Sequence, residues 1–218
     1  MVRCLYLHGF ASGPASSKGR AFADDFGRRG ASVELCDLRV PSLAHLRHGQ
    51  MIERVRELVG DDEAVLIGSS LGGLTAARVA ARTPSVRALV LLAPAFGLIA
   101  RWRARLGEDG WQAWQTTGWL AIDDHATKQR AQVDFGFVED ALALDAADGG
   151  VPPCVVPSWV AHGRADDTVD IARSRAWVAA SGGRASLLEL DDDHQLLASL
   201  PVILPRAWDF LAPWLAPR

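Results

Sequence analysis

The sequence has little that would tie it to a membrane, to nucleic acid or to an oxidising compartment. Its apolar runs all fall short of the roughly 20 residues that a membrane-spanning helix needs. Its formal net charge of -3, with both signs interspersed, leaves no basic stripe for nucleic acid or an anionic lipid surface. Three cysteines without C-x-x-C spacing favour neither a disulfide framework nor a zinc site. We therefore expect no nucleic-acid partner, no stable membrane association and no metal.

Two kinds of motif are also missing. The opening stretch MVRCLYLHGF enters a predicted strand at once, which leaves no room for a signal peptide, so we expect a cytoplasmic protein. The phosphate-loop pattern G-x-x-x-x-G-K-[ST] is absent, because Pro14 follows Gly13 and Lys18 stands further on. The glycines of GSSLGG likewise lack the G-x-G-x-x-G spacing. The sequence thus disfavours nucleotide binding, and we expect no cofactor.

Short apolar segments alternate with helix-like segments along most of the chain. With 218 residues and 49% hydrophobic content, the chain is long enough for one domain with a core on both faces of a sheet. Strands are expected at 2–7, 32–36, 64–67, 88–92, 158–161 and 186–190, and helices at about 15–29, 49–59, 71–82, 170–181 and 195–212. This alternation predicts an α/β fold with a mostly parallel sheet of about six strands. Ligands of such folds bind beyond the carboxyl ends of the strands.

One segment, about 95–152, interrupts the alternation. It offers no convincing strand, and we interpret it as a helical cap inserted into a single domain of residues 1–218. Four of the eight tryptophans of the chain lie in it, at Trp102, Trp111, Trp114 and Trp119. Tryptophan is more often a packing residue than a ligand wall, but this cluster favours at least one ring lining a substrate pocket.

The stretch AVLIGSSLGGL, residues 64–74, contains the G-x-S-x-G frame of a nucleophile elbow. Only Ser70 has glycine two residues before it, Gly68, and two residues after it, Gly72. Ser69 fails the same test. Glycine is needed because a nucleophile on a sharp strand-to-helix turn is held where a neighbouring Cβ would collide. The frame therefore makes Ser70 the candidate nucleophile.

A serine nucleophile needs a base, and the base needs an orienting acid. His194 follows a predicted strand in the loop DDDHQLL, so it is the candidate base, whereas we expect His45, His48 and His125 to be exposed. The segment HGRADDTV follows the preceding strand and supplies the acid: Asp166 is our choice, with Asp167 as the alternative.

Two backbone amides would complete the site by stabilising an oxyanion. The amide of Leu71 directly follows the candidate nucleophile. The amide of Phe10, in the loop after the first strand, is the natural second donor. His8 in that loop is interpreted as a structural residue whose ring bonds loop backbone.

In combination, LHGF, GSSLGG, HGRADDTV and DHQLL resemble the serine esterases of the α/β-hydrolase superfamily. The nearest likeness is to the small bacterial esterases and thioesterases with an HGF loop and a GSSLGG elbow. The four motifs span residues 7–197 in the superfamily order of Ser, Asp and His. The resemblance implies that Ser70 is the nucleophile, His194 the base and Asp166 the acid. It also implies a carboxylesterase-type serine hydrolase that works through an acyl-enzyme on a small-molecule ester.

Two alternatives stay open at this point. The same residues would cleave an acyl-CoA thioester, and Arg101, Arg103 and Arg105 in the insertion could bind the phosphates of CoA. A non-catalytic receptor that keeps the fold and binds a ligand in the cleft is the rival of another class. The sequence does not distinguish acyl chain length, alcohol portion or oligomeric state.

Overall fold

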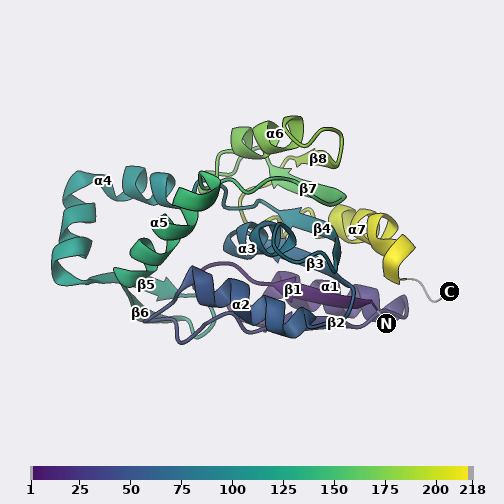
Figure 1. The fold of residues 1–218 in the computed structure, drawn as a ribbon, viewed down its shortest axis with the longest axis horizontal. Helices are drawn as coiled ribbons and strands as arrows, with labels where there is room; N and C mark the ends of the chain where they lie inside the picture. The colour runs from purple at the N-terminus through teal and green to yellow at the C-terminus, as the bar shows by residue number, and fades with distance from the viewer. Residues whose placement is uncertain (1, 216–218) are drawn as a thin grey trace.

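The computed structural model describes residues 2–215, and its centre is a six-stranded parallel sheet (Figure 1). The strand order is β2-β1-β3-β4-β7-β8. The strands are β1 (Arg3–Leu7), β2 (Val33–Cys36), β3 (Ala64–Ser69), β4 (Val86–Leu92), β7 (Ser158–Gly163) and β8 (Ala185–Leu190). Each of the six predicted strands is present, which confirms the α/β fold class and the size of the sheet.

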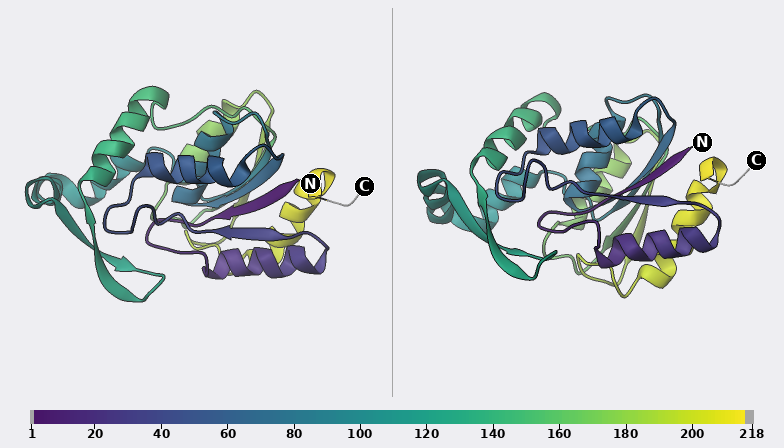
Figure 2. Two further views of the ribbon diagram at one scale, coloured as in Figure 1. Left: turned by 60° about the horizontal axis from the view of Figure 1, so that its bottom comes forward. Right: turned by 90° about the horizontal axis from the view of Figure 1, so that it is seen from below.

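Helices cover both faces of this sheet (Figure 2). They are α2 (His48–Val59), α3 (Leu71–Ala80) and α6 (Ile171–Ala179) on one face, with α1 (Ser17–Arg28) and α7 (Leu200–Leu215) on the other. The central strand β3 is buried along its whole length, and its successive side chains point to opposite faces. Leu66 therefore joins the core under α2 and α3, whereas Ile67 joins the core under α1 and α7.

The insertion lies between β4 and β7, beyond the carboxyl ends of the strands (Figure 1). It consists of α4 (Leu98–Thr117), β5 (Trp119–Asp124), β6 (Gln129–Asp134) and α5 (Gly136–Asp148). The prediction of a purely helical insertion is wrong in one respect, because β5 and β6 form an antiparallel hairpin. Side chains of this hairpin alternate between exposed and partly buried, with Leu120 and Ile122 packed against the core.

A buried ionic network joins the insertion to helices α2 and α3, which cover one face of the sheet. Arg78 of α3 is fully buried and forms ion pairs with Asp145 at 2.5 Å and Asp148 at 2.8 Å, both on α5. Its guanidinium also donates to Nδ1 of His48 at 3.1 Å. A buried guanidinium is stable in a protein interior only when its donors are paired, and here carboxylates and an imidazole pair them.

His48 is a correction to the sequence analysis, which placed it on the surface. It is fully buried, and its Nε2 donates to the hydroxyl of Thr75 at 3.0 Å. That hydroxyl donates in turn to the carbonyl of Leu71 at 2.8 Å, at the start of α3. The partners of His48 come from distant parts of the chain, which is why its local sequence gave no sign of burial.

Among residues 2–215, no helix combines the length and apolar character needed to cross a bilayer.

Candidate active site

Ser70 lies on the sharp turn between β3 and α3. Its φ of 53° and ψ of -116° fall in a region that L residues rarely adopt. A Cβ at Gly68 would lie 2.7 Å from the Cα of Gly73, and one at Gly72 would collide with the carbonyl of Leu7 on β1. These glycines let strand and helix approach closely enough to hold the serine in its strained conformation. Ser69, in contrast, is buried in β3.

The structure brings the three predicted side chains together in one line. Nε2 of His194 lies 3.0 Å from Oγ of Ser70, and Nδ1 of His194 lies 2.7 Å from Oδ2 of Asp166. An ionised carboxylate only accepts hydrogen bonds, so Nδ1 carries the proton and Nε2 is free to accept from the serine hydroxyl. This is the tautomer in which the imidazole is able to take a proton from Ser70.

Asp166 is held by more than His194. Its Oδ1 accepts from the amides of Thr168 at 2.8 Å and Val169 at 2.7 Å. Its Oδ2 lies 3.0 Å from Nε2 of the buried His162. Burial opposes ionisation of Asp166, but hydrogen bonds from His162, His194 and Val169 outweigh it and hold the pKa of this carboxyl below its ordinary value. Asp166 therefore stays ionised beside His194.

Asp167, the alternative acid of the sequence analysis, has different surroundings from Asp166. The side chain of Asp167 is exposed, and its Oδ1 accepts a hydrogen bond from the hydroxyl of Thr168 at 3.1 Å. It makes no hydrogen bond to His194 in the described part of the chain.

The two predicted oxyanion donors belong to segments that adjoin Ser70. A Cβ at Gly9 would be 3.3 Å from the Cβ of Ser70, so the loop after β1 runs directly beside the serine. Within residues 2–215, the amides of Phe10 and Leu71 donate to no acceptor. His8 fixes this loop through two contacts. Its Nε2 accepts a hydrogen bond from the amide of Leu38 at 3.1 Å, and its Nδ1 lies 2.9 Å from the carbonyl of Gly9. Burial lowers the pKa of His8, which keeps its ring neutral for these contacts.

The four tryptophans of the insertion have different surroundings. The half-buried Trp102 packs edge-on against Phe10, with ring centroids 4.7 Å apart, so it is the one that contacts the predicted oxyanion loop. Trp111 and Trp114 are buried inside the insertion, where Nε1 of Trp114 donates to the carbonyl of Val133 at 3.1 Å. Trp119 is 40% exposed on the hairpin and lies against His45.

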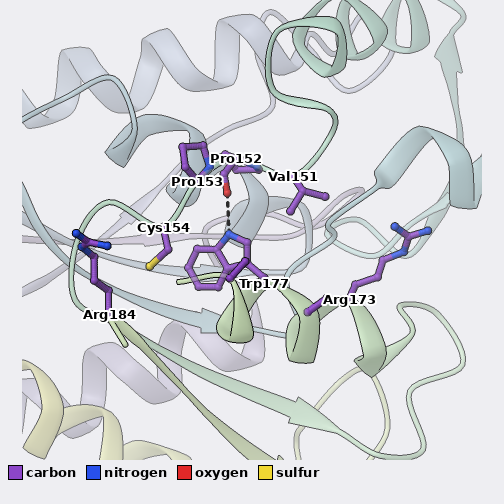
Figure 3. Close-up of a pocket in the computed structure, with 9 residues that line it drawn as sticks. Val151, Pro152, Pro153, Cys154, Arg173, Trp177 and Arg184 are labelled. Atoms are coloured by element: carbon purple, nitrogen blue, oxygen red, sulfur yellow. Dashed lines mark hydrogen bonds between the residues drawn. The ribbon is translucent and has the colours of Figure 1, made fainter. Parts of the chain in front are cut away.

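Two surface cavities lie outside this constellation. The larger, about 620 Å³, lies between α6 and the segment before β7 and is lined by Cys154, Trp177, Arg173 and Arg184 among others (Figure 3). The other, about 560 Å³, lies within the insertion beside Trp111. In the part of the chain that the structure describes, no three His, Cys, Asp or Glu side chains cluster as metal ligands would.

Sequence reasoning missed His162 and the role of Arg101 at this site. His162 is fully buried, its Nε2–H is shared between the carbonyl of Val169 at 2.9 Å and Oδ2 of Asp166, and its Nδ1 lies 2.8 Å from the hydroxyl of Ser174. Its position in HGRADD, four residues before Asp166, was the available signal. Arg101 donates through Nη1 to the carbonyl of Thr168 at 2.6 Å, and nothing in its local sequence indicated that contact.

The chain was compared with the profiles of known protein families. The profile of the uncharacterised protein family UPF0227 matches residues 3–211, nearly the full length. The chain belongs to the UPF0227 family. A search of the curated proteins finds no match to this UPF0227 chain.

Solved structures of known proteins share its fold. Alpha/beta hydrolase domain-containing protein 10 from mouse is 20% identical with a TM-score of 0.73, over 96% of this chain and 89% of that one. Est1E from Butyrivibrio proteoclasticus, also solved with ferulic acid bound, is 20% identical with a TM-score of 0.69, over 97% and 88%. An esterase of Pyrococcus furiosus is 18% identical with a TM-score of 0.65, over 99% and 82%. This member of UPF0227 therefore has the α/β-hydrolase fold.

Proposed function

We propose that the chain is a carboxylesterase-type serine hydrolase of the small HGF-loop, GSSLGG type. The observation that carries the proposal is the continuous hydrogen-bonded line from Ser70 through His194 to Asp166. A strained serine, a base in the correct tautomer and a buried ionised acid together have the geometry of nucleophilic catalysis. The esterases among the proteins of the same fold add to this support.

The reaction would proceed in two steps. His194 takes the proton of Ser70 as Oγ attacks the carbonyl carbon of the ester, and the imidazolium is stabilised by Asp166. The amides of Phe10 and Leu71 stabilise the oxyanion of the tetrahedral intermediate. His194 then protonates the departing alcohol, which leaves an acyl-enzyme on Ser70. In the second step His194 takes a proton from water as the water oxygen attacks the acyl carbon, and it returns that proton to Oγ of Ser70 as the carboxylic acid leaves.

A receptor that merely binds a ligand would have no need of this arrangement. A strained serine, an Nε2 3.0 Å from its hydroxyl and two amides without an acceptor among residues 2–215 each serve chemistry at one carbon atom. A thioester presents the same kind of carbonyl, so acyl-CoA belongs in any substrate panel.

The test is turnover of 4-nitrophenyl esters of graded acyl length, with acyl-CoA alongside. We expect Ser70→Ala to lower kcat by about 10⁴-fold or more, because the attacking atom is removed. Ser69→Ala is the matched control, since it removes the neighbouring hydroxyl and should retain most of the activity. A purified, folded wild-type chain that hydrolyses no ester or thioester would overturn the proposal, as would an active Ser70→Ala variant.

A further inference from the structure

Three arginines gather where the insertion meets the loop that carries Asp166. Arg101 lies in the first turn of α4, and Arg105 follows one turn later on the same side of that helix. Arg173 comes from α6, and its guanidinium packs against Gly97, the residue that precedes α4. In Figure 3 the side chain of Arg173 extends away from Trp177 and the cavity that both residues line.

These arginines have no carboxylate partner of their own. Within residues 2–215, Arg101, Arg105 and Arg173 form no ion pair, whereas Arg103 on the same helix pairs with Glu108 at 3.1 Å. The nearby Asp166 already accepts hydrogen bonds at both of its oxygens. Three guanidinium groups against the one carboxylate of Asp166 leave a net positive local charge, and such charge attracts anions.

Arg101 also has a buried donor without an acceptor. Its Nε is fully buried and makes no hydrogen bond in the described part of the chain, although its Nη1 bonds Thr168. Burial lowers the pKa of Arg101 to about 10, with Asp166 opposing the change, so the side chain remains charged at neutral pH. An unpaired donor in a buried charged group is costly, and a bound acceptor would relieve that cost.

The cluster lies close to the reacting centre. Arg101 contacts Thr168 in the acid loop, while the next residue, Trp102, contacts Phe10 in the loop beside Ser70. The first turn of α4 thus links the two loops that flank the serine.

We propose that Arg101, Arg105 and Arg173 form a binding site for an anionic substituent, a carboxylate or a phosphate, carried by the substrate of Ser70. The inference rests on the proposed function and narrows it from esters in general to esters or thioesters that bear negative charge. A guanidinium recognises either anion through paired N–H donors.

The experiment compares matched neutral and anionic substrates. The pairs are 4-nitrophenyl butyrate with 4-nitrophenyl hemisuccinate, charged on the acyl side, and methyl 4-acetoxybenzoate with 4-acetoxybenzoate, charged on the alcohol side. Acetyl-CoA with the acetyl thioester of pantetheine tests phosphate. We expect the anionic member of at least one pair to have a kcat/KM about tenfold higher or more, an advantage that falls as salt is added.

Variants show which arginines are responsible for the higher kcat/KM on anionic substrates. Because Arg101 also holds Thr168, the decisive variant is the double substitution Arg105→Gln with Arg173→Gln, which leaves that contact in place. It should reduce the ratio of anionic to neutral kcat/KM by about tenfold. The control Arg103→Gln removes a paired arginine from the same helix and should keep the ratio. Equal kcat/KM within all three pairs, or a preference that survives the double variant, would overturn the proposal.

A direct binding measurement separates this proposal from the proposed function. Calorimetric titration of Ser70→Ala with 4-acetoxybenzoate, 4-nitrophenyl hemisuccinate and acetyl-CoA needs no turnover. Salt-sensitive binding of at least one of them that is weakened about tenfold by the double variant supports the anion site even if the wild type hydrolyses nothing. If neutral esters are hydrolysed but no anion binds to Ser70→Ala, the anion site is wrong and the esterase proposal stands.

Discussion

At the scale of single residues, Asp166 and Asp167 are adjacent in sequence but face different surroundings. Asp166 is enclosed and accepts hydrogen bonds from His194 and two backbone amides, while Asp167 points to solvent. The spacing of HGRADDTV could only nominate the pair, because the direction of a loop side chain depends on the surrounding fold. The flanking glycines that nominate Ser70 are a local signal, and the strained strand-to-helix turn that they predict is present.

Exchanging each acid for its amide tests this difference. Asp166→Asn should lower kcat on a 4-nitrophenyl ester by about 10⁴-fold, because an amide facing Nδ1 favours the tautomer with its proton on Nε2. Asp167→Asn should change kcat by less than about threefold, since its carboxylate bonds only Thr168. The reverse ranking, with both variants folded by circular dichroism, would assign the acid to Asp167.

At the scale of elements, the buried strands could be predicted from the sequence and the more exposed ones could not. The six sheet strands were predictable because strands buried on both faces are continuous apolar runs, as in β3. The β5–β6 hairpin was not, because half of the residues in its two strands are exposed and its apolar alternation is short. The network of Arg78, His48 and Asp148 joins segments far apart in the chain, so no local pattern revealed it.

The contact between α4 and the loop after β1 predicts a specific role for Trp102. Trp102→Ala should alter the ratio of kcat/KM between short and long acyl esters several-fold, because the ring packs on Phe10 beside the proposed oxyanion hole. Trp114→Ala is the comparison: its buried indole should cost about 3 to 5 kcal/mol of unfolding free energy. Trp102 is only half-buried, so its loss should cost less stability.

Ester kinetics and urea unfolding of both variants show whether each tryptophan lines the substrate site or only packs in the core. An unchanged acyl-length ratio in Trp102→Ala would mean that α4 is scaffold and does not wall the substrate site. A shift of the ratio in Trp114→Ala at full stability would contradict the division between a packing tryptophan and a pocket tryptophan.

At the scale of the whole molecule, two buried histidines predict acid sensitivity. Burial, together with Arg78 and Arg82, holds the pKa of His48 well below its ordinary value, and burial lowers that of His8. The unfolded chain therefore takes up protons below about pH 6.5 that the native state refuses. Stability should fall as the pH drops, by about 1.4 kcal/mol per pH unit from His48 alone. Asp166, with its lowered pKa, adds a further loss only below about pH 4.

Urea unfolding at pH 7.5, 6.0 and 5.0 measures this slope. His48→Gln should flatten it, whatever its effect on absolute stability, while the exposed His125→Gln should leave it as in the wild type. Stability that does not change between pH 7.5 and 5.0 would show that His48 is not held neutral in the native state.

Covalent labelling with a fluorophosphonate, followed by mass spectrometry of the intact chain and its peptides, tests directly whether Ser70 is an activated nucleophile. Such a probe reacts with a serine whose hydroxyl is activated by an adjacent base and whose oxyanion is stabilised. We expect one adduct, on Ser70, and its near-complete loss in His194→Ala. An adduct on Ser69, or equal labelling of Ser70 with and without His194, would contradict this expectation.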